Sequence, residues 1–316
     1  MLTPAEADAA IAAHRVQFPE ELLTLPACAG RVLRQDIHAE RDAPPFDRVA
    51  MDGIAIAIAA FRDGRRKFRV AAMQAAGQAP VPLESPTDCI EVMTGASLPS
   101  GCDTVVPVER LSVAAGVATI DAAYAPEPWM HVHRRAADAR AGDRLLASGT
   151  RLGGPELAIA ASAGQSTLKV TRLPRIAVIS TGDELVEPDR PILDHQVRRS
   201  NSYGLAASLR LAGFPPATDL HLPDQRPLLV QRLAAEIGRH DVLVLSGGVS
   251  AGRHDYVPAV LAEIGVRRVF HQVAQRPGRP LWFGVHDQGA LVFALPGNPV
   301  SVLVCLARYV IPALLA

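Results

Sequence analysis

The stretch that decides the fold is Arg175-Ile-Ala-Val-Ile-Ser-Thr-Gly-Asp-Glu184, and a second stretch of the same kind is Asp241-Val-Leu-Val-Leu-Ser-Gly-Gly-Val-Ser-Ala-Gly-Arg-His-Asp255. Each begins with a short run of aliphatic residues, which predicts a strand buried on both faces. Each run then breaks into glycines, hydroxyl side chains and an acid. Ligands of open parallel sheets bind just beyond the carboxyl ends of the strands. We therefore expect a ligand site formed by these two loops.

The composition of the two loops favours a phosphate group held together with a metal ion. Backbone N–H groups in glycine loops and nearby hydroxyls can bind phosphate oxygens. The residues expected in this role are Ser180, Thr181, Gly182, Ser246, Gly247, Gly248 and Ser250. Because carboxylates would repel a bare phosphate, Asp183, Glu184 and Asp255 indicate a Mg²⁺ ion between protein and phosphate. The alternative is that both loops are ordinary strand ends with helix-capping residues.

After Pro174 the sequence alternates between strand and helix patterns. We expect strands at 175–180, 241–246, 281–285 and 290–295, and helices at about 201–213, 224–238 and 255–265. This alternation predicts an α/β domain with a doubly wound, mostly parallel sheet and right-handed crossovers.

The last strand leads into a third strand-to-helix turn, Pro296-Gly-Asn-Pro299. Asn298 as N-cap and Pro299 as first helical residue predict the start of a terminal helix. The exposed amino end of that helix suits an anion beside Pro296, Gly297 and Asn298. Capping alone is an equally good explanation of the motif.

The first half of the chain has a different pattern. A capping box at Thr3 and Glu6 predicts a helix to about residue 15. Short strands separated by Pro and Gly are expected at 68–72, 88–93, 104–108 and 117–120, with no long helical period between about 27 and 125. Asp52 and Thr94 each precede a glycine and are predicted to occupy turns at strand ends. A further helix at about 154–164 and an extended segment at 166–172 lead to Pro174, the clearest domain boundary.

Composition excludes several classes of function. Lys+Arg and Asp+Glu are both 32 in 316 residues, so no net charge favours nucleic acid or an anionic membrane. Aromatic residues make up only 4%, which argues against base-stacking platforms. The four cysteines show no metal-ligand or disulfide spacing. No apolar run is long enough to span a bilayer and the first residues do not resemble a signal peptide, so we expect a cytoplasmic protein.

The segment Gln275-Arg-Pro-Gly-Arg-Pro280 places two arginines around a Pro-Gly turn. Arginine binds phosphate and other oxyanions through paired N–H groups. Arg276 and Arg279 are therefore predicted to form an anion clamp. The alternative is a solvated turn with two surface arginines.

Seven motifs follow one another in a recognisable order. They are Met51-Asp-Gly53, Met93-Thr-Gly-Ala-Ser-Leu-Pro-Ser-Gly101, Arg134-Arg-Ala-Ala-Asp138, Ser180-Thr-Gly-Asp-Glu-Leu185, Ser246-Gly-Gly-Val-Ser-Ala-Gly-Arg-His-Asp-Tyr256, Pro277-Gly-Arg-Pro280 and Leu295-Pro-Gly-Asn-Pro-Val-Ser301. From about residue 3 onward they resemble the motifs of the molybdopterin molybdenumtransferases, the MoeA/gephyrin family. The last domain alone also resembles the molybdopterin adenylyltransferases, but the first half does not belong to that shorter family.

The resemblance implies an enzyme of molybdenum cofactor biosynthesis. Such an enzyme inserts molybdate into adenylylated molybdopterin and releases AMP in a Mg²⁺-dependent reaction. The family also implies a homodimer and a contact with a molybdopterin adenylyltransferase. The implied domains are a linking domain of residues 1–26 and 140–172, an inserted mostly β domain of residues 27–139, and an α/β domain of residues 173–316 that binds molybdopterin and nucleotide.

The resemblance also assigns roles to single residues. Glu184 and Asp255 would hold Mg²⁺ or position the pyrophosphate, with Asp183 as a second candidate ligand. Arg276 and Arg279 stand where the family usually has lysines. Asp52, Thr94 and Asp138 match positions that, in the family, face the active site from the other subunit.

Three departures from the family pattern leave an alternative open. Ile54 replaces a tyrosine, and Arg198-Arg199 replaces a Tyr-Asp pair before the helix that starts at Asn201. The family normally continues beyond the terminal helix into a small β domain, which we expect to be naturally missing, removed, or supplied by another protein. The alternative is a catalytically impaired pterin- or nucleotide-binding paralog that carries or senses the cofactor. A scaffold role has no support in the residues, and molybdate and tungstate are too similar to distinguish.

Overall fold

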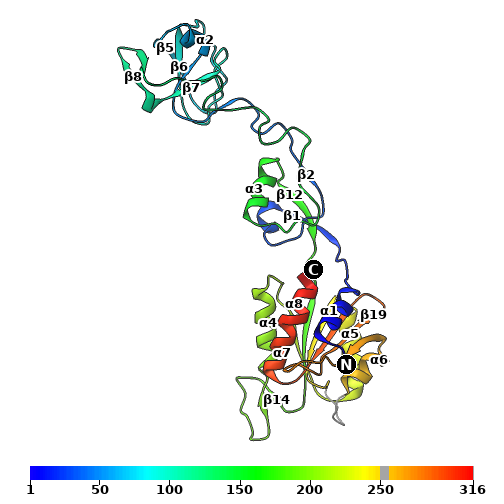
Figure 1. Cartoon of the computed structure of the whole chain (residues 1–316). Coiled ribbons are helices and arrows are strands. Elements are labelled where there is room, and N and C mark those ends of the chain that lie inside the picture. Colours follow the sequence, from blue (N-terminus) through cyan, green and yellow to red (C-terminus); the bar gives the residue numbers. More distant parts are fainter. Residues whose placement is uncertain (250–255, 316) are drawn as a thin grey trace. The chain divides into compact units, whose positions relative to one another are not determined.

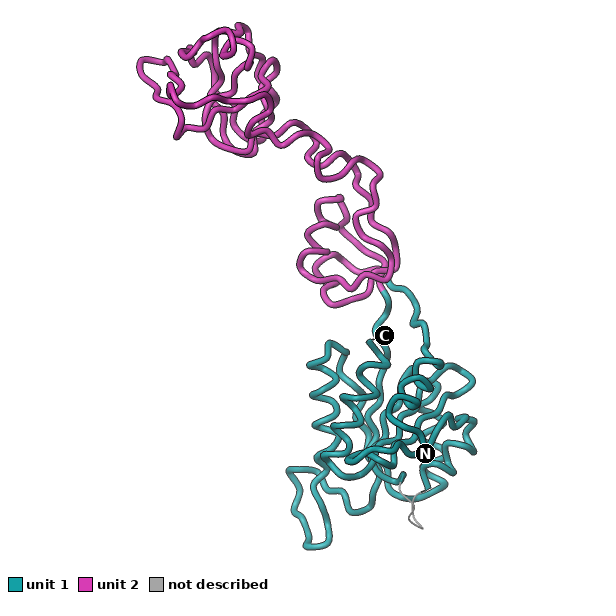
Figure 2. Tube along the Cα trace, in the orientation of Figure 1, with its two compact units in different colours: residues 1–21, 171–316 teal, residues 22–170 magenta. Residues whose placement is uncertain are grey.

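The computed structural model describes residues 1–249 and 256–315 and divides into two compact units (Figure 2). One combines Met1–Glu21 with Thr171–Ala316, and the other is Leu22–Val170. We call them the α/β unit and the β-rich unit. Two residues expected in the ligand loop, Ser250 and Asp255, lie outside the described residues.

The α/β unit is built on a six-stranded sheet. Its order is β16 (Thr218–Leu222), β13 (Ile176–Thr181), β17 (Val242–Ser246), β20 (Leu291–Leu295), β19 (Trp282–His286) and β18 (Val266–His271). The first four strands are parallel, and β19 runs antiparallel to both of its neighbours. This arrangement confirms the predicted α/β fold with a mostly parallel sheet.

Helices cover both faces of this sheet. They are α1 (Pro4–Ala12), α4 (Asn201–Leu211), α5 (Arg226–Ile237), α6 (Val257–Glu263) and α7 (Pro299–Cys305), the last continued by a π-helical turn, η3 (Leu306–Val310), and by α8 (Ile311–Leu315). Ile176 and Val178 of β13 pack in one core with α1, α4 and α7, whereas Ala177 and Ile179 pack in another with α5 and α6. Figure 1 shows α4 and α7 on one side of this unit and α5 and α6 on the other. The alternation of β13 side chains thus divides the interior into two layers.

The amino-terminal helix belongs to the α/β unit. The predicted capping box forms, because the Thr3 side chain accepts from the Glu6 backbone and the Glu6 carboxylate accepts from the Thr3 backbone at 2.7 Å. Ala7 and Ile11 of α1 are buried in the α/β core. Residues 1–21 therefore group with the α/β unit, which differs from the linking domain expected for residues 1–26.

The terminal helix also starts as predicted. The Asn298 Oδ1 atom accepts hydrogen bonds from the backbone of Val300 and Ser301 at 3.1 and 3.2 Å. The helix widens into the π-helical turn just before Pro312, which has no N–H to donate to the preceding turn.

The β-rich unit contains a second six-stranded sheet. Its order is β7 (Thr104–Pro107), β4 (Gly53–Ile56), β6 (Asp88–Val92), β5 (Lys67–Gln74), β9 (Val117–Ile120) and β8 (Leu111–Ala114). All pairs are antiparallel except β5 with β6. Shorter elements nearby in sequence are β3 (Arg48–Val49), α2 (Ile58–Arg62), η2 (Val108–Arg110) and β10 (Val132–His133). The short strands predicted for this half of the chain are confirmed.

A separate core lies elsewhere in the β-rich unit. It contains Cys28, Leu33, Ile37, Leu146 and Leu168, contributed by both ends of the unit's sequence. The surrounding elements are β1 (Glu20–Thr24), paired with β12 (Thr167–Thr171), β2 (Ile37–His38), paired with β11 (Arg144–Leu146), η1 (Leu25–Cys28) and α3 (Gly154–Ser162). Within the described residues, no helix is long and apolar enough to cross a membrane.

Candidate functional site

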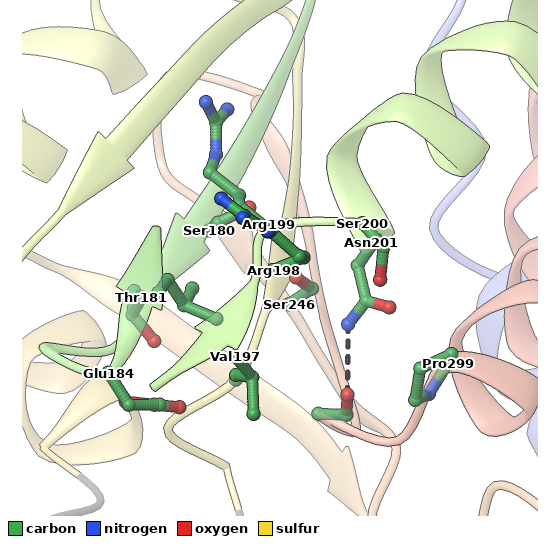
Figure 3. Close-up of a pocket in the computed structure, with 13 residues that line it drawn as sticks. Ser180, Thr181, Glu184, Val197, Arg198, Arg199, Ser200, Asn201, Ser246 and Pro299 are labelled. Atoms are coloured by element: carbon green, nitrogen blue, oxygen red, sulfur yellow. Dashed lines mark hydrogen bonds between the residues drawn. The ribbon is translucent and has the colours of Figure 1, made fainter. Parts of the chain in front are cut away.

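A pocket of about 320 Å³ opens at the carboxyl ends of β13 and β17, where the sequence predicts a ligand site (Figure 3). Six of the predicted residues line it: Ser180, Thr181, Glu184, Ser246, Gly247 and Gly297. Seven others complete the lining: Leu185, Val197, Arg198, Arg199, Ser200, Asn201 and Pro299. The two strand-end loops therefore meet in one hollow, as expected for a parallel sheet.

Buried hydroxyl groups form the floor of the pocket. Ser180, Thr181 and Ser246 are only 1%, 4% and 3% exposed. The hydroxyls of Ser180 and Thr181 find no hydrogen-bond partner within residues 1–249 and 256–315. A buried polar group without a partner is costly. A ligand rich in oxygen atoms would satisfy both hydroxyls.

Glycine is required where the two loops approach each other. Gly247 has a φ of +99°, and a Cβ atom there would lie 2.6 Å from the Thr181 carbonyl oxygen. Gly248 has a φ of +65°, and its Cβ would lie 2.7 Å from the Val257 side chain. Any larger residue would push the β17 loop away from β13. The glycines thus allow the two loops to pack closely beside the pocket floor.

The turn before α7 supplies another wall. The Asn201 side-chain amide donates to the Gly297 carbonyl oxygen at 2.9 Å, which joins the start of α4 to this turn (Figure 3). Asn298 uses its own side chain to cap α7, and Pro296 is buried. Of the three residues predicted here as ligand contacts, only Gly297 lines the pocket.

The two predicted metal ligands that the structure describes, Asp183 and Glu184, lie in different surroundings. Glu184 lines the pocket, and Gly182 leaves room for its carboxylate, which a Cβ at position 182 would meet at 2.6 Å. Asp183 instead accepts a hydrogen bond from the Asp224 backbone at 3.1 Å. In the part of the chain that the structure describes, no three His, Cys, Asp or Glu side chains come together to hold a metal. Carboxylate and hydroxyl oxygens are nevertheless the ligand type that Mg²⁺ prefers.

Residues 182–200 form a segment that we call the arch. It contains β14 (Leu185–Val186) and β15 (Val197–Arg198), and it is closed by hydrogen bonds from Val197 to Glu184 at 3.0 Å and from Arg199 to Val186 at 2.9 Å. Six of the pocket's lining residues come from it.

Arg199 is paired with acidic side chains. The Arg199 guanidinium is buried and donates to the carboxylates of Glu187 in the arch and Asp219 in β16. The hydrogen bond from Arg199 lowers the pKa of Glu187, while burial raises the pKa of Asp219. Two carboxylates thus surround one guanidinium.

Arg276 and Arg279 lie in an exposed turn that does not line the pocket. The turn follows β18, which runs in the same direction as β20, so it lies at the same edge of the sheet as the pocket. Gln275 fixes the turn, because its amide oxygen accepts from the Tyr309 hydroxyl at 2.5 Å. The predicted clamp is therefore anchored but separate from the pocket lining.

In the β-rich unit, two predicted residues contact each other. Asp52 precedes β4 and Thr94 follows β6, and the Asp52 carboxylate accepts from the Thr94 backbone at 2.6 Å and from its hydroxyl at 2.8 Å. These hydrogen bonds lower the pKa of Asp52. Asp138 lies instead against His133, whose Nε2 atom is 3.0 Å from the carboxylate.

Most of the arch residues that line the pocket were not predicted from the sequence. Its four strand residues form two very short strands, and Pro188 and Pro191 interrupt any periodic pattern between them. The useful signal was positional, because the arch runs from the Gly182 loop to the start of α4. Both ends of the segment were predicted to lie at the ligand-binding edge.

Two family models match the chain. The MoeA N-terminal region, described as domains I and II, matches residues 2–164, and a probable molybdopterin-binding domain matches residues 177–316. A molybdopterin molybdenumtransferase of Synechocystis is 42% identical over 98% of this chain and 80% of its own length. The enzyme of the same name from Haemophilus influenzae is 32% identical over 95% of this chain and 74% of its own length.

A solved structure has the same fold along the whole chain. The crystal structure of a molybdopterin biosynthesis MoeA protein from Pyrococcus horikoshii superposes with a TM-score of 0.80 at 29% identity. It covers 100% of this chain and 79% of the other.

Proposed function

This chain belongs to the MoeA family of molybdopterin molybdenumtransferases, and we propose that it inserts molybdate into adenylylated molybdopterin with release of AMP. The observation that carries the proposal is the pocket floor, where the buried Ser180 and Thr181 hydroxyls lack partners beside the Gly247 backbone. Buried hydroxyl groups without partners suit the oxygens of a pyrophosphate, which can accept their hydrogen bonds. Catalysis would come mainly from positioning and from stabilising charge as the P–O bond breaks.

We assign the acidic residues to Mg²⁺ and the arginines to molybdate. Glu184, with Asp255, would hold Mg²⁺, which neutralises the pyrophosphate oxygens when it is bound. Arg276 and Arg279 would donate hydrogen bonds to molybdate, a tetrahedral dianion. Ser246, which also belongs to the pocket floor, and Gly248 would contact the same phosphates as Ser180 and Thr181.

AMP release by the purified protein tests this proposal. With adenylylated molybdopterin, molybdate and Mg²⁺, we expect the wild-type chain to release AMP and Glu184→Gln to release it about 100-fold more slowly. Glu263→Gln is the matched control, because Glu263 is an exposed acid that pairs with Arg226 on the surface of the same unit. A wild-type chain that releases no AMP would end the proposal.

We also propose a cytoplasmic homodimer in which each site is completed by Asp52, Thr94 and Asp138 of the other subunit. Within the β-rich unit, we propose that residues 27–139 form an inserted domain distinct from the linking segments. Mixing Asp52→Ala chains with Glu184→Ala chains tests the dimer. If the residues act across subunits, mixing two inactive variants recovers roughly a quarter of wild-type activity, since half of the dimers contain one intact site. Failure to recover activity in verified mixed dimers would contradict this arrangement.

A second candidate function is a pterin- or nucleotide-binding paralog that carries the cofactor without turnover. The arginine at position 199 favours it, because this position is acidic in the family pattern. Tight AMP binding with no AMP release, unchanged in Glu184→Ala, would support this function. The contact with a molybdopterin adenylyltransferase belongs to both candidates, because either would receive its ligand from that enzyme.

A further inference from the structure

The arch is attached to the rest of the α/β unit in an unusual way. None of its side chains belongs to either hydrophobic core of the unit. From residue 183 to residue 200, Arg199 is the only buried residue. Apolar packing therefore contributes little to the position of this pocket wall, and polar contacts must hold it.

Those polar contacts converge on one guanidinium. Arg199 donates both to Glu187 within the arch and to Asp219 on β16, the edge strand of the sheet. The Tyr203 hydroxyl of α4 donates to the second oxygen of Glu187 at 3.2 Å. The arch, the edge strand and the first turn of α4 are thus joined through this cluster.

Apart from the Ser200 carbonyl, which accepts from the Gly204 backbone of α4 at 3.2 Å, the other hydrogen bonds of the arch to described residues lie at its beginning or within it. The Gly182 carbonyl oxygen is 2.9 Å from His221, and Asp183 accepts from the Asp224 backbone. Arg198 donates only to carbonyl oxygens of Glu187 and Arg190 inside the arch. Near its far end, where Val197 and Arg198 face the pocket, Arg199 supplies the side-chain link to the sheet.

We propose that Arg199 is a positioning residue, which sets the shape of the ligand pocket by clamping the arch to β16 through Glu187 and Asp219. The side chain acts through its neighbours, because its two terminal nitrogens, Nη1 and Nη2, donate to the two acids. The inference rests on the proposed function for its choice of ligand, although the clamp itself is independent of it.

Hydrogen–deuterium exchange and AMP affinity together test the clamp. Arg199→Met keeps most of the side-chain volume but removes the charge, which leaves Glu187 and Asp219 facing each other. We expect amide exchange in residues 185–199 to rise about tenfold or more while exchange in β13 and β17 is unchanged. The KM for adenylylated molybdopterin and the AMP dissociation constant should rise about tenfold, with kcat falling much less.

Swapping the charges at positions 199 and 219 tests whether the clamp can be restored. Arg199→Asp should loosen the arch, and the double variant Arg199→Asp with Asp219→Arg should restore slow exchange, since a guanidinium again lies between two acids. Glu187→Gln, a milder change at a half-buried side chain, serves if the other variants do not fold. Arg226→Met is the matched control, because it breaks an arginine–glutamate contact of 2.7 Å on the surface of the same unit.

Two results would overturn the proposal. One is an arch that exchanges no faster in a folded Arg199→Met protein, and the other is faster exchange throughout the sheet, which would make Arg199 a general stabilising residue. If the wild-type protein neither binds AMP nor releases it, the proposed function fails, but the exchange comparison still decides whether the clamp exists.

Discussion

Asp241 shows how one residue secures the edge of the sheet opposite the pocket. It precedes β17, and its carboxylate accepts from Arg172 at 2.9 Å and from the Arg175 backbone at 2.7 Å. Burial would raise its pKa, but the hydrogen bonds from Arg172 and Arg175 outweigh burial and lower the pKa to about 2. The charged carboxylate therefore stabilises the folded α/β unit.

The sign of this effect gives a pH-dependent prediction. Because the folded pKa is below the ordinary 3.8, the stabilisation is present above pH 3.8 and disappears as the pH falls towards 2. We expect Asp241→Asn to lower the free energy of unfolding by about 1–2 kcal/mol at pH 7 and by progressively less below pH 4. Urea melts of this variant and of Asp189→Asn, an exposed acid, would measure the difference. An equal loss at pH 7 and pH 2 would contradict the assignment.

Two buried serine hydroxyls without partners allow effects on folding stability and on AMP binding to be measured separately. Ser180 lines the pocket, whereas Ser202 is equally buried and unpartnered among the described residues but does not line it. We expect Ser180→Ala to leave stability almost unchanged and to weaken AMP binding about fivefold to tenfold. Ser202→Ala should change neither quantity. Calorimetric titration with AMP makes the comparison, and equal affinities in the two variants would argue against a ligand role for Ser180.

At the scale of elements, the close approach of the two strand-end loops depends on glycine. Gly247→Ala adds strain from a φ of +99° and a contact of 2.6 Å with the Thr181 carbonyl. Gly289, in the turn between β19 and β20, has a φ of +89° but open space around its Cβ position. We expect Gly289→Ala to cost about 1 kcal/mol of stability, and Gly247→Ala to cost more and also to reduce AMP affinity. Thermal melts and AMP titrations of the pair measure both effects.

Elements differ in how far the sequence could predict them. The strands at 176–181 and 242–246 were predictable because continuous aliphatic runs have one main explanation, a strand buried on both faces. The glycine loops and Asn298 were predictable from local backbone requirements. The arch was not, since its position depends on Arg199 reaching Asp219, twenty residues further along the chain. Contacts of this kind leave no periodic pattern.

At the scale of the whole molecule, the chain is organised as two separately packed units. Ile11 of α1 is 6% exposed in the α/β core, although it lies far in sequence from the rest of that unit. The capping box predicted α1 itself, but no local signal could assign it to a core built mainly from residues after 171. For the same reason, residue 11 offers a way to perturb one unit alone.

Ile11→Ala should lower the stability of the α/β unit by about 2–4 kcal/mol and leave the β-rich unit unchanged. Differential scanning calorimetry should therefore show one transition shifted to lower temperature and one in place. AMP should raise the shifted transition, because ligand binding stabilises the unit that holds the pocket. Ile192→Ala, at a 41% exposed position, is the control. A single transition that moves as a whole would contradict independent packing.

The discontinuous α/β unit also has a consequence for synthesis on the ribosome. Residues 22–170 are contiguous, so the β-rich unit can fold as soon as it has emerged. Helix α1 is made before the β-rich unit, but the strands and helices that cover Ala7 and Ile11 are made after it. At cellular elongation rates this nascent helix waits on the order of tens of seconds for its core. During that interval its apolar face is open to a chaperone, and the pocket is assembled only after Pro299, its last lining residue, has been made.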